Sequence, residues 1–250
     1  MSMLRHMSSR ATWTTPAFAL RRLIPAGYGV FLAGFVISGA LFSAGRKLRL
    51  DNGVMSDLLS RIDNPRGYLF STIATVACGV LLLPTATIFQ RGWRSAWAVL
   101  GAWFYRVGLI VTIAIGATTP FQQPYIPIHI WLAFLALMSL AAGLALCLVI
   151  AACSNAPARF LLAALGAFQM SALIFLAYVF LSGLFFGADF FAGRRWLLPV
   201  CEWALNALTA VSTVALTAIL ARGSNPPGDF EGRIGPPNKT LQATAAALRR

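Results

Sequence analysis

Apolar residues run along this chain in six long stretches, and short polar segments rich in proline, glycine and arginine separate them. A helix needs about 20 mostly apolar residues to cross a hydrocarbon core roughly 30 Å thick. Backbone groups in lipid must be hydrogen-bonded within their own segment, so each stretch is predicted to be a transmembrane helix. The predicted spans are Ile24–Ala44, Gly67–Phe89, Ala96–Thr118, Ile128–Ala152, Phe160–Phe186 and Leu197–Ala221. The pattern therefore predicts an all-α integral membrane bundle of six transmembrane helices.

The six spans divide the chain into three expected parts. These are a cytoplasmic N-terminal segment (1–23), a transmembrane domain (24–221) and a cytoplasmic tail (222–250). The tail is predicted to be disordered, because it is rich in glycine, proline and asparagine and lacks apolar periodicity. The first apolar stretch has 21 residues, which exceeds the roughly 7–15 residues of a signal-peptide core. We therefore expect this span to be retained, with cleavage as the alternative.

Composition limits the classes of function. Hydrophobic residues make up 58% of the chain and charged residues only 11%, with a mean hydropathy of +0.74. Soluble domains carry roughly 45–50% apolar and about 25% charged residues, so a cytosolic enzyme and a secreted domain are excluded. The net charge is +13, but the basic residues lie mostly in short segments between apolar stretches. Membrane topology accounts for this excess, and no nucleic-acid partner is expected.

The distribution of Lys and Arg predicts the orientation. The side of the membrane that carries both termini would hold 12 of these residues, and the other side 7. The positive-inside rule therefore places both termini in the cytoplasm, in what is expected to be the plasma (inner) membrane of a bacterium.

Three polar residues near the middle of the predicted spans form one candidate site. Arg106 lies ten residues into the third span, where a charge costs roughly 2.5–3.5 kcal/mol on insertion scales and is a functional candidate by default. Its guanidinium either reaches toward the cytoplasmic headgroups, with its stem along Trp103, or pairs inside the bundle, for instance with Gln169. Gln169 lies at a similar depth in the fifth span, and Asn206 in the sixth would complete a polar path.

A second candidate site lies near the outer surface. In the sixth span, polar side chains recur at helical spacing and must face the bundle; they are Glu202, Asn206, Thr209, Thr213 and Thr217. A carboxylate at the depth of Glu202 must be protonated, paired or hydrated. His129 opens the fourth span at the same level, and Asp57 belongs to an outer loop that could fold over it. Asp57, His129 and Glu202 are thus candidates for binding a headgroup or ligand, the alternative being residues wetted by headgroups and water. If His129 and Glu202 pair, the pKa of the histidine should rise.

The inventory of residues argues against several chemistries. With only His6 and His129, the chain cannot ligate haem through two intramembrane histidines or build a multi-histidine zinc site. It has no P-loop, no GxSxG and no HExxH sequence. We therefore expect no catalytic residue, no metal and no cofactor.

Three short segments together carry a resemblance to a known family. They are Ser56-Asp57 followed by Asn64-Pro65 and Tyr68-Leu69-Phe70, then Ile128-His129-Ile130-Trp131-Leu132-Ala133-Phe134, and finally Cys201-Glu202-Trp203. In this order they resemble the six-span superfamily of DRAM, Sfk and CWH-type membrane proteins, and related bacterial six-span proteins, over about residues 24 to 221. The outer loop departs from the eukaryotic pattern, because no glycine follows Met55-Ser56-Asp57-Leu58. The resemblance implies a six-helix architecture and links to membrane-lipid and GPI-anchor remodelling, autophagy or stress responses. Because Asp57, His129 and Glu202 carry the resemblance, it also favours a functional role for these three residues.

Three functional hypotheses remain open on the sequence. The first is a non-enzymatic membrane protein whose outer-leaflet polar pocket binds the headgroup of a membrane lipid or supports a partner. The second is a small transporter or lipid-handling protein with a mid-membrane path lined by Arg106, Gln169 and Asn206. The third is a lipid-modifying enzyme that uses Asp57, His129 and Glu202. The directions in which these side chains point distinguish the three hypotheses.

Overall fold

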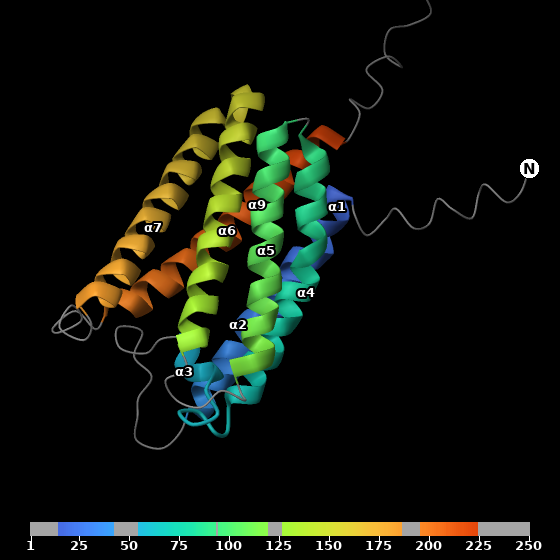
Figure 1. Cartoon of the computed structure of the whole chain (residues 1–250). Coiled ribbons are helices and arrows are strands. Elements are labelled where there is room, and N and C mark those ends of the chain that lie inside the picture. The colour runs from blue at the N-terminus through green and yellow to red at the C-terminus, as the bar shows by residue number, and fades with distance from the viewer. Residues whose placement is uncertain (1–14, 43–54, 94, 120–126, 187–195, 225–250) are drawn as a thin grey trace, which may run out of the picture.

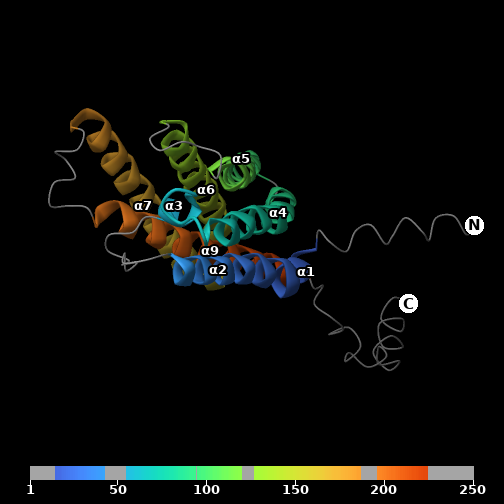
Figure 2. The same ribbon diagram turned by 90° about the horizontal axis from the view of Figure 1, so that it is seen from below.

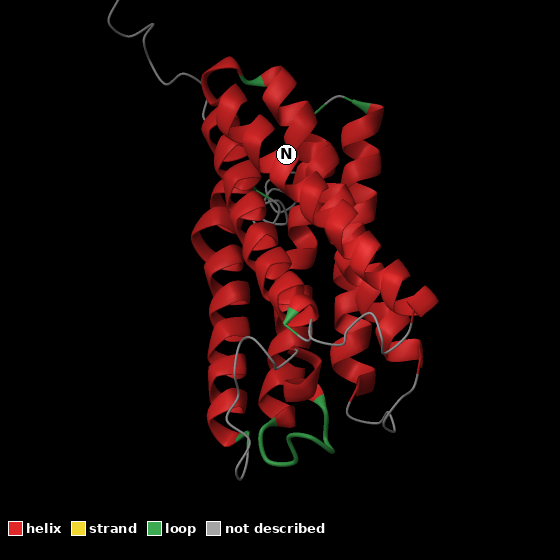
Figure 3. Ribbon diagram, turned by 90° about the vertical axis from the view of Figure 1, so that its left-hand side faces the viewer, coloured by secondary structure: helices red, strands yellow, loops and turns green. Residues whose placement is uncertain are grey.

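The computed structural model describes residues 15–42, 55–93, 95–119, 127–186 and 196–224. All regular secondary structure in these residues is helical (Figure 3). The elements are α1 (Pro16–Phe18), η3 (Ala19–Leu23), α2 (Ile24–Leu41), α3 (Met55–Leu59), α4 (Tyr68–Gly92), α5 (Ala96–Thr118), α6 (Pro127–Ser154), η5 (Ala156–Ala158), α7 (Arg159–Phe186) and α9 (Leu197–Ser224). Within the described residues, six helices are long and apolar enough to cross a membrane. The predicted fold class is confirmed: the chain is an all-α, multi-pass membrane protein.

The first membrane helix begins earlier than predicted. α1, the π-helical turn η3 and α2 form one apolar helix over Pro16–Leu41, which begins eight residues before the predicted span Ile24–Ala44. Thr15 caps this helix, because its hydroxyl accepts a hydrogen bond from the backbone N–H of Phe18 at 3.3 Å. The exposed Arg21 and Arg22 lie on the helix itself rather than before it. At the other terminus α9 ends at Ser224, and the predicted disordered tail otherwise lies outside the described residues.

Four long helices lie side by side in chain order, and a fifth crosses them. Figure 1 shows α4, α5, α6 and α7 running between the same two ends of the bundle, while α9 passes obliquely behind α5 and α6. Seen from below in Figure 2, α2 lies beside α9 and α4. α1 and the last turns of α9 meet at one end of the bundle, which we call the terminal end. α3 lies at the opposite end, the α3 end.

Glycines set how closely the helices approach. A side chain on Gly143 of α6 would collide with the backbone of Tyr105 and with the carbonyl of Gly101, both on α5. α5 and α6 are therefore in backbone contact, which small residues permit in membrane bundles. Toward the terminal end the helices enclose an apolar core whose fully buried side chains include Phe89, Tyr105, Leu144, Leu148 and Leu216.

Candidate functional site

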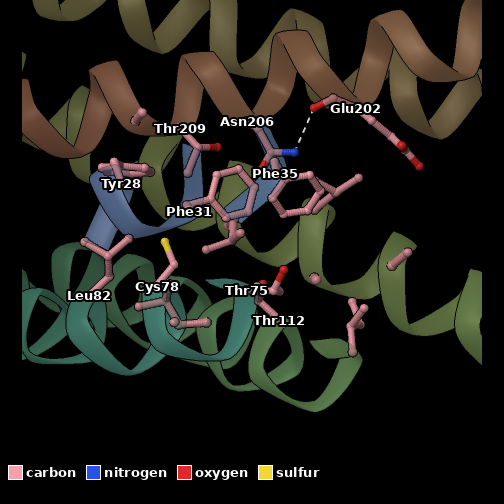
Figure 4. A pocket seen from close by; sticks show the side chains of 18 of the residues that line it. Tyr28, Phe31, Phe35, Thr75, Cys78, Leu82, Thr112, Glu202, Asn206 and Thr209 are labelled. Atoms are coloured by element: carbon pink, nitrogen blue, oxygen red, sulfur yellow. Dashed lines mark hydrogen bonds between the residues drawn. The ribbon is translucent and has the colours of Figure 1, made fainter. Parts of the chain in front are cut away.

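A cavity of about 440 Å³ occupies the α3 half of the bundle. α2, α4, α5, α6 and α9 line it, and Leu59 of α3 closes part of its end. Its size falls within the roughly 300–1,000 Å³ range of ligand sites in proteins. Most of the wall is apolar. Figure 4 shows Phe31 and Phe35 of α2 lying between α9 on one side and α4 on the other.

Aromatic rings form one side of this cavity. The centroids of Phe31 and Phe35 are 4.5 Å apart, and Phe35 meets Trp203 of α9 edge to face at 6.2 Å. The indole N–H of Trp203 is buried and has no hydrogen-bond partner among the described residues. A buried donor left in this state costs free energy that an acceptor atom on a bound molecule would recover.

Hydroxyl groups close the cavity toward the terminal end. The hydroxyl of Tyr28 donates to Thr213 at 3.4 Å, and the hydroxyl of Tyr105 lies 3.3 Å from the same oxygen. The Thr213 hydroxyl itself donates to the carbonyl of Thr209 at 2.8 Å, so it accepts from the tyrosines. Thr85 of α4 adds a contact to Tyr105 at 3.4 Å. This floor joins α2, α4, α5 and α9.

The polar stripe of α9 faces the bundle, as the sequence predicts. Thr209, Thr213 and Thr217 are all buried. Asn206 lines the cavity, and its side-chain amide donates to the backbone carbonyl of Glu202 at 2.8 Å. Glu202 also lines the cavity, and its side chain extends away from Asn206 toward the N-terminal end of α9 (Figure 4).

His129 lines the same cavity, just before the apolar span Trp131–Ser154. Its ring nitrogen Nδ1 lies 3.1 Å from the hydroxyl of Thr119. That hydroxyl donates to the carbonyl of Ile115 at 2.6 Å, so Nδ1 carries the proton and donates to Thr119. Burial lowers the pKa of His129 below its usual value, which is opposite to the rise expected from a pair with Glu202. The histidine and Glu202 share a cavity, but the hydrogen bond of the ring goes to Thr119.

The cavity has a side opening between α2 and α9. Leu32 of α2 and Ala207 of α9 both line it and are both exposed, with Leu32 at 59%. The Phe35–Trp203 contact bounds the opening toward the α3 end, and the Tyr28–Thr213 hydrogen bond bounds it toward the terminal end. Both helices are long and apolar enough to cross a membrane.

Asp57, the third residue of the predicted outer site, lies on α3 and is not among the residues that line the cavity. α3 is held by a buried group that we call the Asn64 cluster, made of Ser38, Leu58, Asn64, Gly67 and Ser71. The side-chain amide of Asn64 donates to the Ser38 hydroxyl at 2.8 Å and to the Leu58 carbonyl at 3.3 Å. Its carbonyl accepts from the backbone N–H of Gly67 at 3.0 Å. Sequence analysis gives Asn64 no structural role, although its place before Pro65 in a break between spans marks a turn.

The residues of the predicted mid-membrane path are not brought together. Arg106 donates to Thr87 at 3.2 Å and to Gln90 at 3.1 Å, both on α4, and its guanidinium lies 4.7 Å from the ring centre of Trp103. The expected partner Gln169 is fully buried and instead accepts from Ser212 of α9 at 3.4 Å. The suggested pairing is therefore wrong. The guanidinium instead joins α5 to α4, and its reach toward cytoplasmic headgroups stays a prediction.

Comparison of the chain with family models, with curated proteins and with solved structures finds no match. The resemblance to the DRAM, Sfk and CWH-type superfamily therefore stays a prediction. Of the six residues predicted from sequence as site residues, His129, Glu202 and Asn206 line one cavity, and Asp57, Arg106 and Gln169 do not.

Proposed function

We propose that this multi-pass membrane protein binds an amphipathic membrane lipid in the cavity. The chain of the lipid fills the apolar interior, and its polar group lies near Glu202 and the indole N–H of Trp203. The observation that carries the proposal is the one-sided arrangement of the cavity. Its interior is mostly apolar, the Glu202 carboxyl and the His129 imidazole both lie toward the α3 end, and its opening lies between α2 and α9.

Binding is better supported than conduction or catalysis. The hydroxyl floor at Tyr28, Tyr105 and Thr213 separates the cavity from the terminal end, so the cavity is not a continuous path. Arg106 is engaged with α4 outside the cavity wall. The Nδ1–H of His129 donates to the Thr119 hydroxyl, whose own proton goes to the carbonyl of Ile115, so the two side chains are not arranged as a general base and its nucleophile. These contacts favour a site that holds a molecule without transforming it.

The proposal includes an orientation. Both termini lie in the cytoplasm of a bacterium and the α3 end faces the periplasm, because the side of the termini carries the larger share of Lys and Arg. The lipid then comes from the outer leaflet of the inner membrane. A reporter active only in the periplasm should give a signal when fused within 46–66 and none when fused after Arg222. The opposite pattern would place the α3 end at the cytoplasmic side, and the lipid would then come from the inner leaflet.

Photo-crosslinking tests lipid binding. A single-chain amphiphile with a diazirine in its chain is added to the protein in maltoside micelles, and labelled peptides are mapped by mass spectrometry. We expect labels on the cavity-lining parts of α2, α6 and α9. Ala133→Phe, which fills the cavity from α6, should remove most of this labelling. Leu135→Phe, on the exposed face of the same helix, is the matched control and should leave it unchanged. Equal labelling in both variants would overturn the proposal.

A further inference from the structure

We propose that a groove between α6 and α7 at the terminal end binds an anionic phospholipid, with the phosphate at Arg159 and one acyl chain along α7. This inference goes beyond the proposed function, because the groove shares no lining residue with the cavity. Three observations carry it: the length of the groove, the small side chains that form it and the charge at its terminal end.

The groove has a volume of about 660 Å³ and follows one face of α7. Its α7 residues recur at helical spacing and so form a single stripe; they are Arg159, Ala163, Gly166, Ala167 and Met170. The rise of an α-helix places Arg159 and Met170 about 16 Å apart along the axis. One leaflet makes up about 15 Å of a hydrocarbon core roughly 30 Å thick. The stripe therefore spans the depth that an acyl chain occupies in its own leaflet.

Small side chains make room for that chain. Gly166 is buried where α7 meets α6. A Cβ added at Gly166 would lie 3.6 Å from the Leu148 side chain and 3.8 Å from that of Val149, so the two helices are in close contact along the bottom of the groove. Ala163 and Ala167 are exposed on the same stripe, and their methyl groups leave the groove open above this contact. An apolar furrow of this kind suits a chain of methylene groups.

Arg159 gives the terminal end of the groove a positive charge. It begins α7, is exposed, and is the charged residue among the described residues that line the groove. The acidic residues that the structure describes all lie toward the opposite, α3 end; they are Asp57, Asp63 and Glu202. Arg159 therefore has no carboxylate partner in the described part of the chain. A guanidinium binds a phosphate through two parallel hydrogen bonds, so a phosphate complements this end of the groove.

The surroundings of Arg159 add to this charge. The turn between α6 and α7 lies at the terminal end of the bundle (Figure 1). Exposed arginines also lie where other helices reach this end; they are Arg21, Arg22, Arg91 and Arg222. The orientation proposed above places this end in the cytoplasmic leaflet, where basic pockets between membrane helices bind anionic headgroups. The groove beside Arg159 supplies the place for the chain, which a free phosphate lacks.

Cys153 of α6 provides the readout. Its thiol lines the groove and is exposed, whereas Cys78, Cys147 and Cys201 are buried. The protein in maltoside micelles receives rising mole fractions of phosphatidylglycerol or phosphatidylcholine and then a short pulse of N-ethylmaleimide. Mass spectrometry measures the alkylation of Cys153 relative to the lipid-free sample of the same variant. We expect phosphatidylglycerol to halve the rate at an about fivefold lower mole fraction than phosphatidylcholine, which corresponds to about 1 kcal/mol.

Two pairs of variants locate the effect. Arg159→Gln should abolish the difference between the two lipids. Arg91→Gln removes an exposed arginine at the same end, on α4, and as the matched control should preserve that difference. Ala163→Leu fills the groove and should weaken the protection of Cys153 by both lipids. Ala164→Leu, on the next exposed residue of α7 and outside the lining of the groove, should leave the protection unchanged.

Several results would overturn the inference. Equal protection by both lipids in the wild-type protein would remove the role of the headgroup charge. A preference for phosphatidylglycerol that survives Arg159→Gln, or that Arg91→Gln also abolishes, would assign the attraction to the whole terminal end rather than to the groove. Inorganic phosphate without lipid should leave the alkylation rate unchanged; protection equal to that by phosphatidylglycerol would mean that the site binds a free anion and no lipid. Because the groove and the cavity share no lining residue, each of these results leaves the proposed function to its own test.

Discussion

Two polar groups of side chains lie at the α3 end of the bundle, and they differ in how completely they are hydrogen-bonded. In the Asn64 cluster, Asn64, Ser38 and Ser71 are fully buried, and each makes a hydrogen bond within the protein. On the cavity wall, the buried indole N–H of Trp203 has no partner among the described residues. Both groups lie at the same end of the bundle, so position alone does not distinguish them.

The difference shows which polar residues in a membrane bundle serve the fold and which are left for a ligand. Buried polar groups in lipid are costly unless they are paired, so a complete network fixes the segments it joins. The Asn64 cluster joins α2, α3 and the start of α4. A buried donor that has no partner beside an apolar cavity gains a hydrogen bond only when a ligand brings an acceptor. That bond then contributes to the free energy of binding. The comparison predicts that changes in the cluster alter stability and that changes on the wall alter binding.

The largest effect is expected from Asn64→Leu. Leucine has a similar size but removes the links from Asn64 to Ser38, Leu58 and Gly67. The loss of a buried hydrogen-bonding partner costs roughly 1–3 kcal/mol. The melting temperature in maltoside should fall clearly, while the affinity of the folded fraction for a single-chain amphiphile should change little.

Asn155→Leu is the matched control, because Asn155 is only half-buried in the segment between α6 and α7. Its melting temperature should stay close to that of the wild type. If the two variants melt at the same temperature, the Asn64 cluster does not hold the α3 end together.

The same comparison explains what the sequence predicts well and what it does not. Span length and hydropathy are local properties, so the bounds of α5 coincide with the prediction Ala96–Thr118. The polar stripe of α9 was predictable for the same reason, because helical spacing assigns its residues to one face. The early start of the first helix could not be predicted, because Arg21 and Arg22 precede the apolar stretch and charged residues usually lie outside a membrane span.

Interactions between distant segments could not be predicted from the pattern. Periodicity assigns Arg106 to a face of α5 but does not say that α4 is the neighbour carrying Thr87 and Gln90. Likewise, the partners of the Asn64 side chain come from α2, α3 and the residue that caps α4. The cavity depends on the oblique course of α9 (Figure 1), which nothing in the periodicity of the sequence encodes.

A smaller effect is expected from acidification at His129. The pKa of the folded histidine is lowered by burial, whereas the unfolded chain titrates near the usual value of about 6.5. The unfolded state therefore binds more protons below about pH 6.5, and stability is lost as the pH falls from that value toward the folded pKa. The melting temperature of the wild type should drop over this range more than that of His129→Gln, which keeps a hydrogen-bonding group near Thr119. Parallel pH profiles of the two proteins would show that His129 is not buried against Thr119 as described.

The smallest effect on stability is expected from Trp203→Phe. The phenyl ring keeps the aromatic contact with Phe35 but removes the buried N–H that has no partner. Lost packing area lowers stability, and removal of an unsatisfied donor raises it, so the two contributions oppose each other. The melting temperature of the ligand-free protein should change by only a degree or two in either direction, which corresponds to roughly 0.5 kcal/mol or less.

The effect of Trp203→Phe should appear on binding instead. A single-chain amphiphile with an ester oxygen in its polar group should raise the melting temperature of the wild type more than that of Trp203→Phe. An amphiphile of equal length without this oxygen should stabilise both proteins alike. If the two amphiphiles do not distinguish the variants, the indole N–H faces no ligand, and the incomplete hydrogen bonding of the wall reflects packing rather than a site.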